Sequence, residues 1–202
     1  MTSAATPRRA PRQHRAQQTV EAILGAVLRI LRRGHPDSLT TNHIAEAAGV
    51  SIGSVYQYFP DKRAIFSALH QRHIDEIDRV IGAVLIQHAT SSLEALVRAL
   101  IEAMIEAHAH DPALYELLSA EVPHRAGGTQ DFALRLHGAF RLAIAAHLHE
   151  LAPARNLDLT VFVLTHMVES LCHGAVLRRP PGITLSAATE EAVHAVLAYL
   201  RS

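Results

Sequence analysis

TTNHIAEAAGVSIGSVYQYFP, residues 40–60 of this 202-residue chain, carries the most specific structural pattern in the sequence. A helix-turn-helix needs a small residue where its two short helices cross, and Ala45 supplies it. The turn needs a residue that tolerates positive φ, and Gly49 follows four positions later. Apolar residues must hold the second helix from beneath, and they stand at Ile44, Ala48, Val50 and Val55. In this order and at this spacing, these residues predict a helix-turn-helix.

Outside this stretch the apolar residues recur at helical spacing almost throughout, and no segment keeps the period-two alternation of a strand. An apolar stripe over residues 20–31 precedes it and is ended by Gly34. Thr40 or Thr41 can cap the first short helix, and Ser51 can cap the second. After Pro60, Asp61 can cap a long helix.

The second half of the chain predicts five further helices. They are expected to open at Thr90 or Ser91, at Pro112 and near Phe132, and then to cover residues 157–177 and about 186–200. We therefore expect an all-α protein of about nine helices. The helix-turn-helix lies near the N-terminus of this chain, and a helical bundle follows it.

The net charge is zero, but the charges are unevenly distributed. Residues 1–62 carry eight Arg and Lys against four Asp and Glu, a net charge of +4, so residues 63–202 carry −4. A basic first third predicts an anionic partner at that end only. Residues 1–15 hold four arginines and no acid, and we expect a disordered basic arm there. It is either a solvated tail or a contact with phosphates or the DNA minor groove.

Composition also argues against several classes of protein. The single cysteine, Cys172, rules out an intramolecular disulfide, and without a signal-like apolar stretch near Met1 we expect a cytoplasmic protein. The longest apolar run, residues 157–177, contains ionisable side chains and is expected to be buried in protein rather than in a membrane. No nucleophile elbow, phosphate loop or supported Cys–His pair indicates an enzyme.

The segment LTTNHIAEAAGVSIGSVYQYFPDKRAIFSAL, Leu39–Leu69, closely resembles the N-terminal domain of the tetracycline-repressor (TetR) family of regulators. The runs Gly49-Val50-Ser51, Tyr56-Gln57-Tyr58-Phe59 and Asp61-Lys62 carry the resemblance. It implies a DNA-binding domain over residues 16–60 and a ligand-binding and dimerising body over residues 61–202. Carried over position by position, the implied contacts with double-stranded DNA are Thr41, Asn42, Ile52, Gly53, Ser54, Tyr56, Tyr58 and Lys62.

The chemistry of these side chains sorts them into phosphate and base contacts. Thr41 at a helix N-terminus offers a hydroxyl and backbone N–H groups to a phosphate, and Lys62, the only lysine, lies at the next N-terminus. The hydroxyls of Tyr56 and Tyr58 can also reach phosphates, unless one of the two rings packs inward.

The recognition helix has no Arg, so bidentate readout of guanine from it is not expected. Gln57 is the best candidate for a hydrogen bond to a base, though it could equally be solvated. Ile52 can contact a thymine methyl group, and Gly53 and Ser54 permit close approach.

Fifteen histidines raise the question of a metal site. His166, Glu169 and His173 share one helical face, but the two histidines are about two turns apart, too far for one ion without other ligands. We expect no metal and no other cofactor. We favour the interpretation that these side chains are polar groups in a ligand pocket or at a dimer seam.

The resemblance also implies an effector cavity in the second half, although core packing is the stronger explanation of each candidate taken singly. The candidates are Met104, His108, Tyr115, Phe132, Leu136, Phe140, Met167 and Leu171. The chain has few aromatic residues and no Trp, which argues against a cage for large cationic drugs. The helices over residues 157–177 and 186–200 carry more apolar surface than one subunit needs, and family architecture makes them a homodimer seam.

These features predict a ligand-responsive regulator. We expect a repressor that binds a palindromic operator as a homodimer and is released by a small, mostly apolar effector. The alternative is a helical ligand carrier or protein-interaction module whose helix-turn-helix does not bind DNA.

Overall fold

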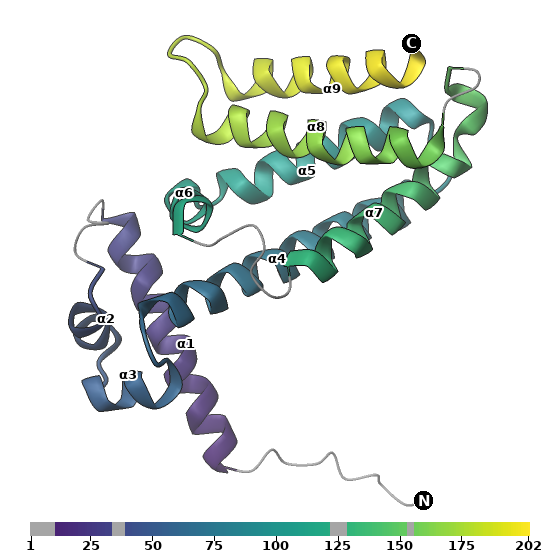
Figure 1. Cartoon of the computed structure of the whole chain (residues 1–202). Coiled ribbons are helices and arrows are strands. Elements are labelled where there is room, and N and C mark those ends of the chain that lie inside the picture. Colours follow the sequence, from purple (N-terminus) through teal and green to yellow (C-terminus); the bar gives the residue numbers. More distant parts are fainter. Residues whose placement is uncertain (1–10, 34–38, 122–128, 153–155) are drawn as a thin grey trace, which may run out of the picture. The chain divides into compact units, whose positions relative to one another are not determined.

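The computed structural model describes residues 11–33, 39–121, 129–152 and 156–202. Within these ranges all regular structure is helical, with nine α-helices and one short 3-10 turn (Figure 1). This confirms the expected all-α class. The chain forms two compact units, one ending at Leu69 and the other beginning at His70, and α4 (Lys62–Gln87) runs from the first into the second.

The first unit contains α1 (Pro11–Arg32), α2 (Thr41–Ala48), α3 (Ile52–Tyr58) and the start of α4. Its core is built from side chains that are fully or almost fully buried, among them Ile23, Val27, Ile44, Val55, Ile65 and Phe66. The unit extends past residue 60, the end of the expected DNA-binding domain, because the first turns of α4 carry buried residues of this unit.

The expectation of a disordered basic arm over residues 1–15 is wrong for part of that range. Residues 11–15 belong to α1, which begins at Pro11. Proline favours the first turn of a helix because its fixed φ suits the helix and its missing N–H would have no partner there. Residues 1–10 lie outside the described part of the chain.

Local caps set the ends of the short helices as the sequence predicted. The Thr40 side chain accepts a hydrogen bond from His43 N and caps α2, while Ser51 accepts one from Ser54 N and caps α3. Gly49 ends α2 with φ at 69°, in the left-handed region. Asp61 Oδ1 accepts from Ala64 N at 2.8 Å and opens α4.

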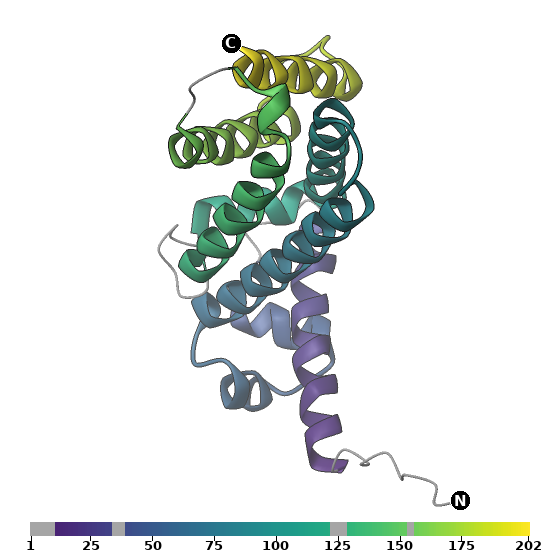
Figure 2. The same cartoon turned by 90° about the vertical axis from the view of Figure 1, so that its right-hand side faces the viewer.

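The second unit contains the rest of α4, followed by α5 (Leu93–Ala109), α6 (Pro112–Glu121), α7 (Thr129–Ala146), the 3-10 turn Leu148–Glu150, α8 (Leu157–Leu177) and α9 (Leu185–Arg201). Helices α8 and α9 lie side by side, α5 packs against both, and α7 packs along α8 (Figures 1 and 2). The cap of α5 is Ser92, one residue after the expected Thr90 or Ser91, since its hydroxyl accepts from Ala95 N.

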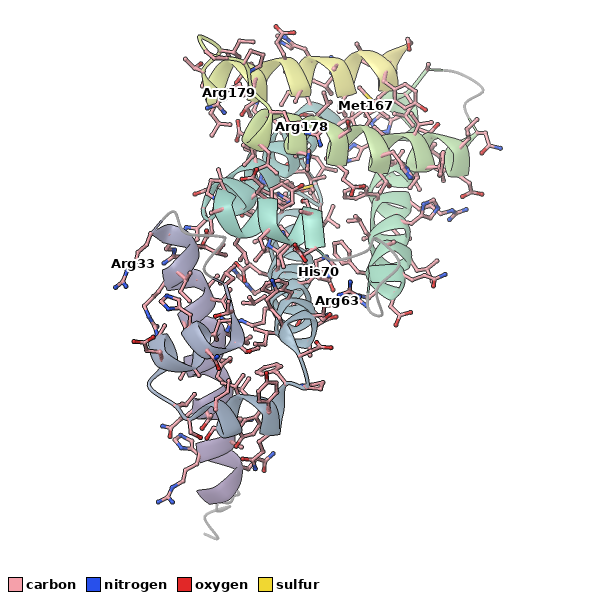
Figure 3. The ribbon with its side chains drawn as sticks, turned by 60° about the vertical axis from the view of Figure 1, so that its left-hand side comes forward. Arg33, Arg63, His70, Met167, Arg178 and Arg179 are labelled. Atoms are coloured by element: carbon pink, nitrogen blue, oxygen red, sulfur yellow. The ribbon has the colours of Figure 1, made fainter. Side chains whose placement is uncertain are left out.

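Helix α8 lies within this bundle. Among the described helices it alone is long and apolar enough to cross a membrane by length and composition, yet it packs against α5, α7 and α9. Arg178 and Arg179 follow its C-terminal end (Figure 3). Arg179 donates to the carbonyl of Ala175 at 2.6 Å, so a cation satisfies the negative end of the helix.

Candidate DNA-binding surface and effector site

Helix α3 has one anchored face and one free face. Val55 is fully buried and fixes the helix, whereas Ile52 is 38% exposed and Tyr56 52% exposed. On the described surface of the first unit Gly53 and Gln57 are also exposed, while Ser54 and Tyr58 are half-buried. The side chains that the sequence assigned to the DNA groove therefore lie on the accessible side of α3 or at its margin.

Two of the proposed phosphate contacts come together. Thr41 Oγ1 at the start of α2 lies 3.3 Å from the hydroxyl of Tyr56 on α3. Either oxygen can donate this bond, which leaves the other hydroxyl free to donate to a phosphate. Asn42, next to Thr41, is exposed. The N-terminus of α2 and the middle of α3 thus present a shared hydrogen-bonding edge.

Lys62 is the first residue of α4 and is exposed. Its Nζ lies 5.3 Å from the centre of the Phe66 ring, a cation–π distance that orients the side chain without neutralising its charge. Arg29 on α1 has a different role, because its Nη2 donates to the Ala47 carbonyl at 2.6 Å and ties α1 to the end of α2.

The eight effector candidates all belong to the second unit, and they do not jointly line either of two hollows in its described part. Met104, His108 and Phe140 are buried, and the other five are half-buried. Phe140 lines a cavity of about 30 Å³, roughly one water molecule, between α5, α7, α8 and α9. An open groove of about 500 Å³ between α5 and α9 contains none of the eight. Met167 is a residue of α8, and its side chain packs against the hydrophobic core of the second unit (Figure 3).

Two of the candidates, His108 and Tyr115, instead take part in a group of four rings, which we call the imidazole cluster: His73 on α4, His108 on α5, Tyr115 on α6 and His173 on α8. The ring centroids of His73 and His108 are 5.1 Å apart, and those of His108 and Tyr115 are 4.2 Å apart. Tyr115 also lies 5.7 Å from His73 and 5.4 Å from His173. Four helices therefore contribute one ring each to one place.

Burial disfavours the charged forms of three of these rings. It lowers the pKa of His73 to about 4, with His108 and His70 adding to the shift and Glu76 opposing it. Burial also lowers the pKa of His108, against its bond to Met104, and raises the pKa of Tyr115 to about 12. At neutral pH His73 and His108 are neutral imidazoles and Tyr115 is a protonated phenol.

The sequence did not single out His73, although a signal was present. The buried residues Ile65, Leu69, Ile77 and Ile81 repeat every four positions along α4, and His73 occupies the missing place in that series. A polar residue on a buried stripe needs partners in the fold.

In the possible ligand trio of His166, Glu169 and His173, the two histidines have different partners. His166 is exposed and its Nδ1 donates to the Phe162 carbonyl at 2.8 Å, whereas His173 contacts Tyr115. Across the described residues, no group of three or more His, Cys, Asp or Glu side chains is arranged to hold a metal ion.

Comparison with known families covers both units. The family model described as "Bacterial regulatory proteins, tetR family" matches residues 23–69. The one described as "Tetracyclin repressor-like, C-terminal domain" matches residues 92–200.

Individual proteins match this chain only at low sequence identity. The nucleoid occlusion factor SlmA of Haemophilus ducreyi is 30% identical over 107 residues, 53% of this chain and 50% of SlmA. The HTH-type transcriptional activator FasR of Mycolicibacterium smegmatis is 30% identical over 111 residues, 55% of this chain and 49% of FasR. The matched region spans about half the length of these relatives. The crystal structure of a TetR-family transcriptional regulator from Streptomyces coelicolor is similar with a TM-score of 0.64 at 22% identity, covering 90% of this chain and 97% of that one.

Proposed function

The chain belongs to the tetracycline-repressor (TetR) family of bacterial regulatory proteins, and we propose that it is a cytoplasmic repressor released from DNA by a small effector. It is a DNA-binding transcription regulator by family. Its proposed operator is palindromic and is bound by a homodimer. The proposed division of labour is DNA binding by residues 16–60, with any basic arm before them, and effector binding and dimerisation by residues 61–202.

The observation that carries the DNA-binding role is the accessible face of α3 together with its two flanking helix starts. Thr41 and Tyr56 form one hydrogen-bonding edge, and Lys62 supplies a positive charge at the next helix N-terminus. Phosphate contacts of this kind fix the orientation of a protein on the duplex. They leave Ile52 and Gln57 to face the base edges, with Gly53, Ser54 and Tyr58 beside them and Asn42 next to Thr41.

The effector is proposed to act through α4. This helix is continuous from Lys62 into the second unit, so a displacement of its body end is transmitted to its DNA end. Two recognition helices of a dimer must match the groove repeat of about 34 Å, and a few ångströms of added separation would cost contacts in one half-site. A tenfold loss of DNA affinity requires about 1.4 kcal/mol of differential effector binding.

A mobility shift with the DNA upstream of the protein's own gene tests the DNA-binding role. Retarded DNA that is released by unlabelled specific DNA, but not by an equal mass of unrelated DNA, is the expected result. A double variant, Thr41→Ala with Lys62→Ala, should bind weakly. If the folded wild-type chain shows no preference for any such fragment, the alternative function holds, a helical carrier or interaction module.

The direction of regulation needs a separate experiment, because the relative FasR is named as an activator. We expect a reporter fused to the bound promoter to rise in expression when the gene for this protein is deleted. A fall in reporter expression would identify an activator and contradict the repressor assignment.

A further inference from the structure

We propose that the imidazole cluster receives the acidic head group of the effector, a carboxylate carried on an apolar body. This inference rests on the effector-responsive function proposed above and names the chemistry of its ligand. The cluster lies entirely within the second unit, where His73, His108, Tyr115 and His173 arrive from four different helices.

The cluster has unused hydrogen-bonding capacity. His108 Nδ1 lies 2.6 Å from the carbonyl oxygen of Met104, and a carbonyl only accepts, so Nδ1 carries the proton of the neutral ring. Its Nε2 is then a free acceptor. Within the described part of the chain, His73 makes ring contacts but neither of its nitrogens forms a hydrogen bond. Buried polar groups are normally paired, so these two rings call for a partner.

Among the described residues, the cluster also holds hydrogen-bond donors that no partner uses. His173 Nδ1 lies 3.2 Å from the Tyr115 hydroxyl. If the hydroxyl donates this bond, the proton of the neutral His173 ring is on Nε2 and is free. If His173 donates it, the hydroxyl proton of Tyr115 is free. In either tautomer the pair keeps one unused donor, and neutral His73 adds another. Two donors in one cluster match in number the two oxygens of a carboxylate.

The charges around the cluster favour an anionic head group over a cationic one. An anion beside His73 or His108 favours the protonated imidazole, so ligand binding and proton uptake support each other. The acids that face these rings are Glu76 on α4, which interacts with His73, and Glu169 on α8, which interacts with His108 and Tyr115. Both carboxylates are exposed to solvent, and Glu76 is paired with Arg79. The remaining facing groups are His70 and the neutral thiol of Cys172. A cationic head group would therefore find no buried counter-ion in the cluster.

The surroundings suit an apolar body. Met104, one turn before His108, and Cys172, next to His173, belong to the hydrophobic core of the second unit. Met167 and Leu171 are half-buried beside that core. A flexible chain can enter such a core by displacing methionine and leucine side chains, since these adapt their rotamers readily.

The test compares three probes that share one alkyl chain: decanoate, 1-decanol and decyltrimethylammonium. Calorimetry on the full chain should give the tightest binding for decanoate. Its dissociation constant should fall as the pH is lowered from about 8 to about 6, by at most tenfold per pH unit for one linked proton. The sign follows because His73 and His108 have lowered pKa values in the free protein, so both rings gain protons when a bound anion raises those values. Titrations in two buffers of different ionisation enthalpy should show net proton uptake, and decanol should show neither effect.

Two variants locate the effect. His73→Phe keeps an aromatic ring but removes both nitrogens, and it should weaken decanoate and abolish the pH dependence. His194→Phe alters an exposed histidine on α9 and should change neither. Equal binding of decanoate and decanol, tighter binding of the ammonium probe, or no decanoate binding would overturn the acidic-head proposal. None of these outcomes affects the proposed repressor role, which fails if DNA is not bound specifically, if no effector releases it, or if the reporter falls in expression on deletion of the gene.

Discussion

Lys62 differs from the other proposed DNA contacts because its contribution depends on charge alone. Its Nζ is exposed and is held near the Phe66 ring, at the N-terminus of α4. A contact with a phosphate contributes to binding of every sequence and releases about one counterion. Replacing Lys62 should therefore change the affinity for DNA without changing which sequence is preferred.

Lys62→Ala should weaken binding to all DNA sequences alike and reduce the salt slope of binding by about one unit. Lys62→Arg keeps the charge and should leave the slope unchanged. Fluorescence anisotropy over a range of salt concentrations measures both. A change in the preferred sequence on replacing Lys62 would show that the side chain reads bases.

Gln57 should behave in the opposite way. It is exposed on α3, where no Arg is present to recognise guanine. Gln57→Ala should cost about 1–3 kcal/mol of discrimination at one base pair of each half-site and leave nonspecific binding unchanged. Binding to a set of single-base operator variants gives this result directly. Uniform loss across the set would instead place Gln57 against the backbone.

At the scale of the element, the start and end of each short helix could be predicted because capping is local. Thr40, Ser51 and Asp61 act within three residues of their own positions, so the sequence contains the whole interaction. The imidazole cluster could not be predicted in the same way. His73 and His173 are a hundred residues apart in the chain, and their neighbourhood depends on how α4, α5, α6 and α8 pack.

Gly49 gives an element-scale test of the turn. Its φ is 69°, and a Cβ added there would have no atom within 4 Å, so the effect of a side chain is backbone strain alone. Gly49→Ala should destabilise the protein by about 1–2 kcal/mol. Gly82→Ala, in the middle of α4 and also with open space around it, should stabilise it by about 0.5–1 kcal/mol. Urea unfolding of both variants measures the contrast, and equal effects would exclude turn strain.

Glu150 links the 3-10 turn to α5. His147 Nδ1 lies 2.9 Å from Glu150 Oε1, and Leu93 N at the start of α5 donates to the same carboxylate at 3.1 Å. The bond from His147 and then the bond from Leu93 hold the pKa of Glu150 below its ordinary value. The ionised form is therefore stabilising above the unfolded pKa of about 4.3, and this stability is lost as the pH falls through the lower folded pKa.

Glu150→Gln should lower the free energy of unfolding by about 1 kcal/mol at neutral pH, because an amide is a weaker acceptor than a carboxylate. The difference from the wild type should shrink as the pH falls below about 4. Glu191→Gln removes a carboxylate from the exposed His194 pair on α9 and should have no measurable effect. If the two variants unfold alike, the Glu150 cap does not stabilise the second unit.

At the scale of the whole molecule, the proposed palindrome requires a two-fold dimer, and the dimer requires an apolar seam. On the described surface of α8, Leu159 is 60% exposed and Phe162 is 54% exposed, one turn apart on the face that also carries His166. Large apolar side chains grouped on one helix face mark an association surface. Around a two-fold axis the same face serves both subunits, so one substitution acts twice.

Phe162→Asp should therefore convert the dimer to a monomer at micromolar concentration in sedimentation velocity, because two unpaired carboxylates would be buried at the seam. Operator affinity should fall with it, since two half-sites about 10 base pairs apart can then be held only independently. Ile86→Asp changes an apolar side chain that is 81% exposed near the end of α4, a helix outside the proposed seam, and should leave both properties unchanged. A Phe162→Asp protein that stays dimeric would place the seam elsewhere, whereas a wild-type protein that is monomeric would contradict the palindromic operator itself.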